Sequence, residues 1–262
     1  MSLLANLDHL YNECKRNQWL RYFAVFCRVA LALGFIPSGL VKVMGERFTA
    51  LPSNHPLGHY FDALYLTGFY YRFIGVSQLT AALLLLIPRT TLLGAILYLP
   101  IIFNICVLTY ATRFEGTRIA TLMLLANLYL LCWDYARLKY VLPLASSSDV
   151  GTAPNQKMSL KFPLVFFICA VAAVVSVIVI NNFVYDIRPG NSQLECTNGC
   201  ANNARPEACE RFCNCIYNDG NPLDQCLEQY GKRKKRLHLL RNIMQALNFK
   251  SNRLRGECSY EF

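Results

Sequence analysis

Six cysteines lie close together near the C-terminal end of the 262-residue chain: Cys196, Cys200, Cys209, Cys213, Cys215 and Cys226. Two pairs among them are spaced four residues apart, so on a helix both sulfur atoms of a pair lie on one face. Two short antiparallel helices, joined by the turn-like sequence ANNARPEA, would place Cys196 opposite Cys213. The same arrangement would place Cys200 opposite Cys209. Cys215 and Cys226 flank the turn sequence NDGNP and form a candidate third pair, although sequence alone does not fix the connectivity.

Clustered cysteines support three kinds of chemistry. Structural disulfides are favoured if this segment lies outside the cytoplasm, because a small domain without a large core needs covalent staples. Structural zinc also uses two pairs of ligands at short spacing, and it is the less favoured interpretation. A catalytic dithiol normally has two residues between its cysteines, a spacing that occurs nowhere in this chain. Cys258 is left without an assigned partner. The other five cysteines are scattered, and we expect them to pack as small apolar side chains.

A second group of candidates consists of polar side chains in or beside apolar segments: Lys42, Glu46, Arg72, Gln78, Asn104 and Asn127. Charged and amide groups at membrane depth are costly unless they pair or line a cavity, so these residues are candidates for binding a ligand such as a quinone or a lipid. The alternative is that they form hydrogen bonds between helices. Lys42 and Glu46 are four residues apart and are expected to share a helix face. No catalytic residue and no metal ligand is assigned.

His55 and His59 are also four residues apart, with Asp62 nearby. A metal or haem site would need partners that the sequence does not place. We therefore expect both histidines to be solvent-exposed residues in an interfacial loop.

The elements that must position these residues are membrane helices. Hydrophobic residues make up 54% of the chain and charged residues 16%, which indicates a polytopic membrane protein. Five apolar segments are expected to span the bilayer: residues 22–44, 73–88, 91–111, 119–133 and 162–184. The predicted organisation is an N-terminus (1–21), a four-helix membrane domain (22–140), a polar linker (141–161), a fifth transmembrane helix (162–184) and a cysteine-rich α-helical domain (185–262). No cleavable signal peptide is predicted.

The charge distribution predicts the orientation. With the N-terminus in the cytoplasm, nine cations lie on the inner side: Lys15, Arg16, Arg21, Arg28, Arg89, Arg137, Lys139, Lys157 and Lys161. Five lie on the outer side: Lys42, Arg47, Arg72, Arg113 and Arg118. Nine against five favours this orientation, and five spans then place the C-terminal domain outside, in the periplasm if the source is bacterial.

The cations behind the net charge of +10 are spread unevenly, since 12 of the 26 Lys and Arg residues lie from Arg188 onward. The stretch 231–249, GKRKKRLHLLRNIMQALNF, is predicted to form a basic amphipathic helix that lies on anionic lipid or in a partner's groove. No nucleic-acid-binding motif accompanies it, so nucleic acid is not an expected partner.

Residues 28–139 resemble the DoxX-like family of small four-helix membrane proteins. The stretches that carry this resemblance are RVALALGFIPSGLVKV, RFIGVSQLTAALLLLIPRTTLLGAILYLPIIFNI and MLLANLYLLCWDYARLK. The resemblance implies a four-helix bundle and an association with quinone-linked and oxidative-stress complexes, or with membrane-protein assembly. It carries over no catalytic motif.

These observations favour a non-enzymatic role. The leading hypothesis is an integral membrane subunit or assembly factor of a membrane protein complex, in contact with membrane lipids and protein partners, with a disulfide-stapled domain for docking. The alternative is a quinone-interacting oxidoreductase subunit that uses the polar residues of the bundle.

Overall fold

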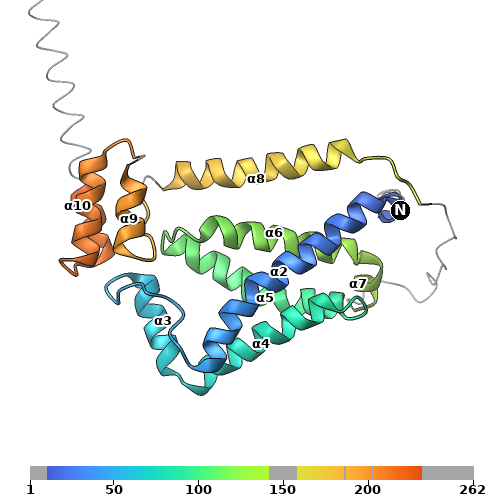
Figure 1. Ribbon diagram of the computed structural model, residues 1–262, viewed down its shortest axis with the longest axis horizontal. Coiled ribbons are helices and arrows are strands. Elements are labelled where there is room, and N and C mark those ends of the chain that lie inside the picture. Colours follow the sequence, from blue (N-terminus) through green and yellow to red (C-terminus); the bar gives the residue numbers. More distant parts are fainter. Residues whose placement is uncertain (1–10, 142–157, 186, 202, 232–262) are drawn as a thin grey trace, which may run out of the picture. The chain divides into compact units, whose positions relative to one another are not determined.

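The computed structural model describes residues 11–141, 158–185, 187–201 and 203–231 (Figure 1). Their regular structure is helical, with one isolated bridge between Asn17 and Ser159. The predicted all-α fold class is therefore confirmed. The described residues form two compact units: the first lies within Met1–Ala50 and Tyr60–Arg188, and the second within Leu51–His59 and Pro189–Phe262. Cys258 and the predicted basic helix, from residue 232 on, lie outside the described residues.

The first unit contains the membrane helices. They are α2 (Gln18–Met44), α4 (Phe69–Leu86), α5 (Thr91–Ala111), α6 (Thr117–Trp133) and α8 (Leu164–Val184), and the short helix α7 (Tyr135–Val141) follows α6. In the described part of the chain, α2, α4, α5 and α8 are long and apolar enough to cross a membrane, and α6 is a shorter apolar helix. The chain is therefore a multi-span membrane protein.

Local signals set both ends of α2. The Asn17 side chain caps its start by accepting hydrogen bonds from the backbone N–H groups of Trp19 and Leu20. The helix ends at Gly45, whose φ of 78° lies in the left-handed region that favours glycine. The next residue, Glu46, donates its N–H back to the Val41 carbonyl. The expectation that Lys42 and Glu46 share a helix face is therefore wrong, because the helix stops between them.

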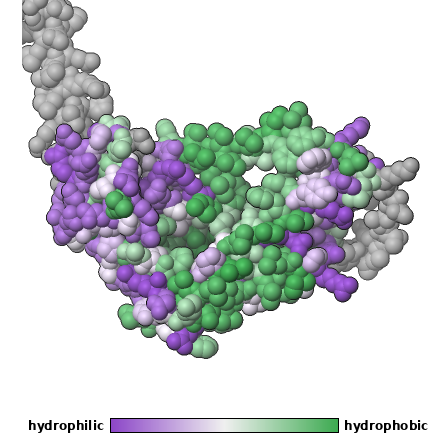
Figure 2. Space-filling model, viewed as in Figure 1, coloured by the Kyte–Doolittle hydropathy of each residue, from purple (hydrophilic) through white to green (hydrophobic). Residues whose placement is uncertain are grey.

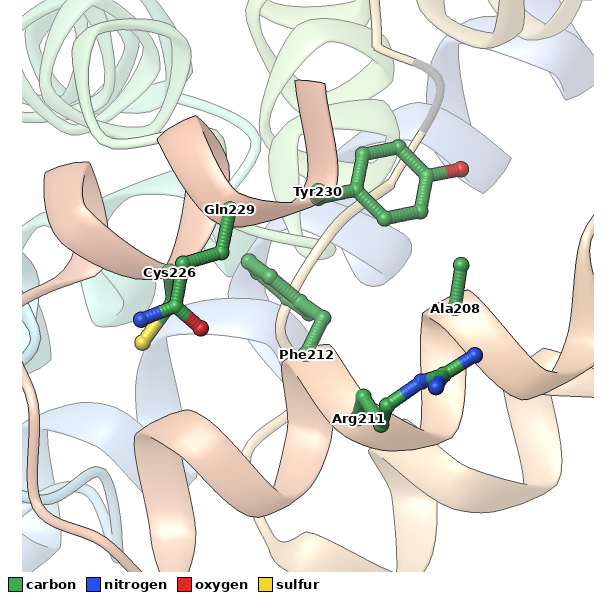
Figure 3. Close-up of a pocket in the computed structure, with 6 residues that line it drawn as sticks. All are labelled: Ala208, Arg211, Phe212, Cys226, Gln229 and Tyr230. Carbon is green, nitrogen blue, oxygen red and sulfur yellow. The ribbon is translucent and has the colours of Figure 1, made fainter. Parts of the chain in front are cut away.

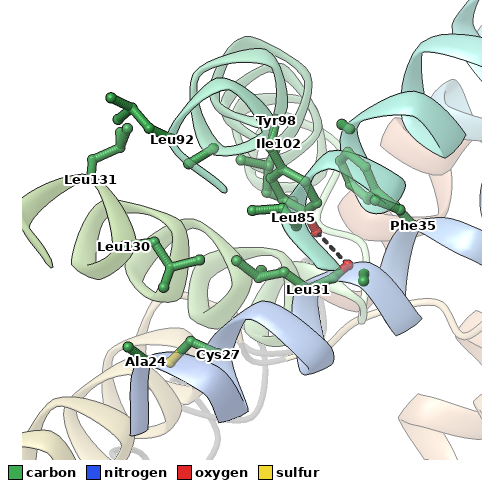
Figure 4. Packing of buried hydrophobic residues seen from close by; sticks show 14 residues of the cluster. Ala24, Cys27, Leu31, Phe35, Leu85, Leu92, Tyr98, Ile102, Leu130 and Leu131 are labelled. Atoms are coloured by element: carbon green, nitrogen blue, oxygen red, sulfur yellow. Dashed lines mark hydrogen bonds between the residues drawn. The ribbon is translucent and has the colours of Figure 1, made fainter. Parts of the chain in front are cut away.

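The core of the first unit lies between α2, α4, α5 and α6 (Figure 4). The rings of Phe35 and Tyr98 stack with centroids 3.6 Å apart, and the Tyr98 hydroxyl donates a hydrogen bond to the Leu31 carbonyl. At the crossing of α2 and α4 the backbones meet directly. A Cβ atom on Gly75 would lie 2.8 Å from the Gly39 carbonyl oxygen, so glycine is required for this approach.

Contacts at the helix ends establish the directions of the helices. The Arg28 guanidinium, in the first half of α2, donates to the Leu85 and Leu86 carbonyls at the end of α4. Gly39 near the end of α2 meets Gly75 near the start of α4, so these helices are antiparallel. Arg118 at the start of α6 bonds to Asn182 at the end of α8, so α6 and α8 are also antiparallel. At the opposite end, residue 159 pairs with Asn17 at the start of α2. The 17-residue α6 is about 26 Å long, close to the thickness of the hydrocarbon layer.

The second unit contains α9 (Gln193–Cys200), α10 (Pro206–Tyr217) and a helical segment at residues 223–231. Three disulfides join them: Cys196–Cys213, Cys200–Cys209 and Cys215–Cys226. The first two are the pairs that the four-residue helical spacing predicts, and the third is the candidate pair that flanks the turn sequence NDGNP. On the face shown in Figure 2, hydrophilic residues predominate over α9 and α10, whereas hydrophobic residues cover most of the helices of the first unit.

The Leu51–His59 segment, between the first two membrane helices, also belongs to the second unit. The Asn54 side chain donates hydrogen bonds to the Ile216 carbonyl over 2.8 Å and to the Asn221 carbonyl over 2.7 Å. Leu51, His55 and Leu57 are fully buried. The expectation of an exposed His55 is therefore wrong, while His59 is exposed. The helix α3 (Pro56–Leu66) continues from this segment into the first unit.

Candidate functional site

A buried cation lies at the crossing of α2 and α4. Lys42 is only 4% exposed, and its ammonium group donates to the Ser38 hydroxyl over 2.6 Å and to the Ser38 carbonyl over 3.1 Å. The third face of the ammonium group meets the Phe48 ring, whose centroid lies 4.0 Å from Nζ. The cation is thus held by one residue of its own helix and one aromatic ring from the loop that follows.

The chain of hydrogen bonds continues into α4. The Ser38 hydroxyl donates to Gln78 Oε1 over 3.2 Å, and Gln78 is 1% exposed. The glycine contact between Gly39 and Gly75 brings the two helices close enough for this bond, since both glycines lie next to the polar residues along the same faces. Lys42, Ser38 and Gln78 therefore form one connected network.

The network has no counter-charge of its own. In the described part of the chain, no carboxylate lies within ion-pair distance of the Lys42 ammonium group; the nearby pair is formed by Arg47 and Asp62, 2.8 Å apart. A buried cation without an anion is costly. Chemically, the arrangement can offer an ammonium group to an anion or to a carbonyl oxygen once the Phe48 ring is displaced.

The other predicted site residues are not part of this network. Glu46 and Arg72 are exposed, and Asn104 is exposed on α5. Asn127 is fully buried on α6, where its amide donates to the Ala95 carbonyl over 3.2 Å and its Oδ1 atom has no hydrogen-bond partner. Of the six candidates, only Lys42 and Gln78 are brought together, and they are joined through Ser38.

The six described cysteines of the second unit are all in disulfides and do not offer thiolates. Sulfur atoms of Cys200, Cys209 and Cys213 lie within 4.8 Å of one another, a spacing that suits a metal ion. All three are engaged in disulfides, and zinc binds cysteine as the thiolate. In this oxidation state the three cysteines serve as structural disulfide cross-links.

A small pocket of about 80 Å³ lies between α10 and the 223–231 helix (Figure 3). Its lining residues are Ala208, Arg211, Phe212, Cys226, Gln229 and Tyr230. The Phe212 and Tyr230 rings pack edge to face, and the Arg205 guanidinium stacks 4.1 Å from the Tyr230 centroid. The pocket is far smaller than a cofactor or substrate site of several hundred Å³, and we assign no ligand to it.

Two sets of residues were missed by the sequence reasoning. One is Asn54 with His55, in a connection whose aromatic content suggested only an interfacial loop. The other is a cluster of arginine and asparagine side chains where α6 begins and α8 ends. The consecutive Asn181 and Asn182 at the end of the long apolar α8 were the available signal for that cluster.

No family model matches the chain, and no solved structure matches it. The chain is similar to the uncharacterized protein YwoB of Bacillus subtilis (strain 168), with 34% identity over 122 residues. The alignment covers 41% of this chain and 73% of that relative.

Proposed function

Since the chain belongs to the same family as YwoB of Bacillus subtilis, we propose that it is an integral membrane subunit or assembly factor of a membrane protein complex. No family model matches the DoxX-like resemblance of residues 28–139, so that resemblance stays an expectation and does not carry the proposal. YwoB is an uncharacterized protein and supplies no activity, so the proposal rests on the surface of the membrane unit.

The observation that carries the proposal is the position of Asn104. It lies in the interior of the apolar helix α5 and is exposed, next to Phe103 at 56% and Val107 at 52% exposure. An amide that faces lipid has no water to bond with, so a hydrogen-bonding neighbour from another helix stabilises it. The exposed residues of α5 recur at three-, four- and seven-residue intervals, as in helix–helix seams: Leu93, Pro100, Phe103, Asn104, Val107 and Ala111.

The test compares Asn104→Leu with a matched control, Thr80→Val. Thr80 is also an exposed polar residue within an apolar helix, but its hydroxyl already donates to the Val76 carbonyl. The size of the tagged protein is measured after extraction in a gentle detergent. We expect the wild type and T80V to run as an assembly larger than one chain and N104L to run as a single chain. A wild-type protein that runs alone contradicts the proposal.

We further propose that the second unit lies outside the cytoplasm and acts as a docking domain. The excess of cations on the opposite side supports this orientation. The number of proposed membrane crossings is consistent with this orientation. One crossing precedes the Leu51–His59 segment and five precede Pro189, and both numbers are odd, so both parts of the second unit lie on the side opposite to the N-terminus. An impermeant thiol reagent, applied to intact cells, is expected to label Cys196 and its neighbours only after reductant is added. Labelling without reductant would refute the stapled external domain.

A second candidate function is binding of a quinone at Lys42, as part of an oxidoreductase. It is favoured by the buried ammonium group without a carboxylate partner. Quinone extracted from the purified wild-type protein should then be lost in Lys42→Met and retained in Arg89→Gln, a variant of an exposed cation in the α4–α5 connection. A wild-type protein without bound quinone or absorbing cofactor removes this candidate.

A further inference from the structure

Four polar residues meet where α6 begins and α8 ends: Arg118, Asn181, Asn182 and Arg188. The Arg118 guanidinium donates to Asn182 Oδ1 over 2.6 Å and to Asn181 Oδ1 over 3.5 Å. The Arg188 guanidinium donates to the same two oxygen atoms, over 2.9 Å at Asn182. Two guanidinium groups therefore converge on one pair of amide side chains.

The positive charge of this cluster is not neutralised by the part of the chain that the structure describes. There, no carboxylate lies within ion-pair distance of Arg118 or Arg188. Amide oxygens carry only partial charge, so two full positive charges remain close together. Burial, and next the charge of Arg118, lower the pKa of Arg188, while Glu115 acts in the opposite direction without pairing with it.

The cluster also contains a hydrogen-bond donor without a partner. Asn181 is fully buried, its Oδ1 atom accepts from both arginines, and its Nδ2 atom has no acceptor. A third cation lies close by, since the Arg113 guanidinium packs 5.4 Å from the centroid of the Tyr185 ring. Donors and positive charge thus gather at one place, where the described residues supply no anion with several acceptor oxygens.

The position of the cluster in the fold narrows the class of anion. The helix α6 starts at Thr117 and the helix α8 ends at Val184, so the cluster lies at the ends of two apolar helices, at the depth of phospholipid headgroups. Guanidinium groups bind phosphate oxygens in a bidentate manner. We propose that Arg118, Asn181, Asn182 and Arg188 form a binding site for an anionic phosphate group, carried either by the headgroup of a phospholipid with net negative charge or by a small phosphorylated solute.

The experiment uses the full-length protein in nanodiscs and measures its thermal unfolding. One arm compares discs of phosphatidylcholine with discs that contain phosphatidylglycerol; the other titrates inorganic phosphate into phosphatidylcholine discs at constant ionic strength. Stabilisation by phosphatidylglycerol alone identifies the lipid headgroup, and saturable stabilisation by inorganic phosphate identifies a soluble ligand. If neither ligand raises the unfolding temperature of the wild type, the proposal is wrong.

Three variants separate binding from packing. Arg188→Gln is expected to raise the ligand concentration needed for half-maximal stabilisation about tenfold or more, because it removes charge-assisted hydrogen bonds. Arg89→Gln, an exposed arginine outside the cluster, is expected to retain it. Asn181→Asp supplies a carboxylate to both arginines, so it should keep or raise the unfolding temperature while abolishing the ligand effect. A ligand effect that survives in N181D, or that is lost equally in R89Q, would overturn the assignment.

Discussion

His55 is a buried titratable side chain that the second unit uses in its neutral form. Its Nδ1 atom accepts the Leu57 N–H at the start of α3, and its Nε2 atom is buried without a partner in the described part of the chain. Burial lowers the pKa of His55 to about 4 from its ordinary value near 6.5. The unfolded chain therefore binds an extra proton between these two values, and protonation favours unfolding.

The resulting prediction concerns the pH dependence of the second unit. Because the folded pKa lies below the unfolded pKa, the free energy of unfolding should fall as the pH drops from about 6.5 to about 4, by up to about 3 kcal/mol. His55→Asn keeps an acceptor for the Leu57 N–H but does not titrate, so it should flatten this dependence. Hydrogen exchange of residues 51–59 at several pH values measures it. The matched control is His59→Asn, at an exposed histidine, and it should keep the wild-type dependence of the free energy of unfolding on pH. If H55N shows the same pH dependence as the wild type, His55 is not the titrating group.

At the residue scale, the sequence identified Lys42 and Gln78 as candidate site residues but did not relate them. Their link depends on Ser38, which is an unremarkable residue in an apolar helix until α4 packs against it. The outward direction of Asn104 depends on which side of α5 faces the bundle, and α5 is too uniformly apolar for its sequence to reveal that. The ends of helices were also hard to place, since the left-handed Gly45 separates Lys42 from Glu46.

At the scale of elements, the membrane helices were predictable because long apolar runs have few alternatives in lipid. The expected segment 91–111 has the bounds of α5, and the fifth segment differs from α8 by two residues at its start. The cysteine pairing was predictable because helical spacing restricts which sulfur atoms face one another. The Leu51–His59 segment was not, because its place in the second unit depends on Asn54 reaching carbonyl groups more than 160 residues away.

Because α2 and α4 are in close contact where they cross, the loss of stability caused by a glycine-to-alanine substitution should depend strongly on the position of the glycine. A Cβ at Gly75 meets the Gly39 carbonyl oxygen, a backbone atom that cannot move alone, so Gly75→Ala should destabilise the protein by about 1–3 kcal/mol. A Cβ at Gly34 meets only the Cε end of the flexible Met123 side chain at 2.4 Å. Gly34→Ala should therefore lower the thermal unfolding temperature in detergent clearly less than G75A. Equal effects would contradict the close contact of α2 and α4.

At the scale of the whole molecule, the three disulfides should order a segment that contains no cysteine. The Leu51–His59 segment is held by Asn54 to the carbonyls of Ile216 and Asn221, which both lie within the loop that the Cys215–Cys226 disulfide closes. Each bridge closes a short loop and should contribute about 2–4 kcal/mol. Reduction should therefore raise hydrogen exchange in residues 51–59 together with residues 193–226. Asn54→Ala should raise exchange in residues 51–59 without reductant, and protection of that segment after full reduction would contradict this account.

The central claim, that the membrane unit is part of a larger membrane protein complex, is tested most directly by site-specific photo-crosslinking in native membranes. A photoreactive residue at position 103 or 107 lies beside Asn104 on α5, and one at position 83 lies on α4, where Leu83 is 60% exposed. We predict that positions 103 and 107 crosslink to one discrete membrane protein and that position 83 reacts mainly with lipid. If all three positions give only lipid adducts, the α5 face is a lipid surface and the account of this protein as a complex subunit is wrong.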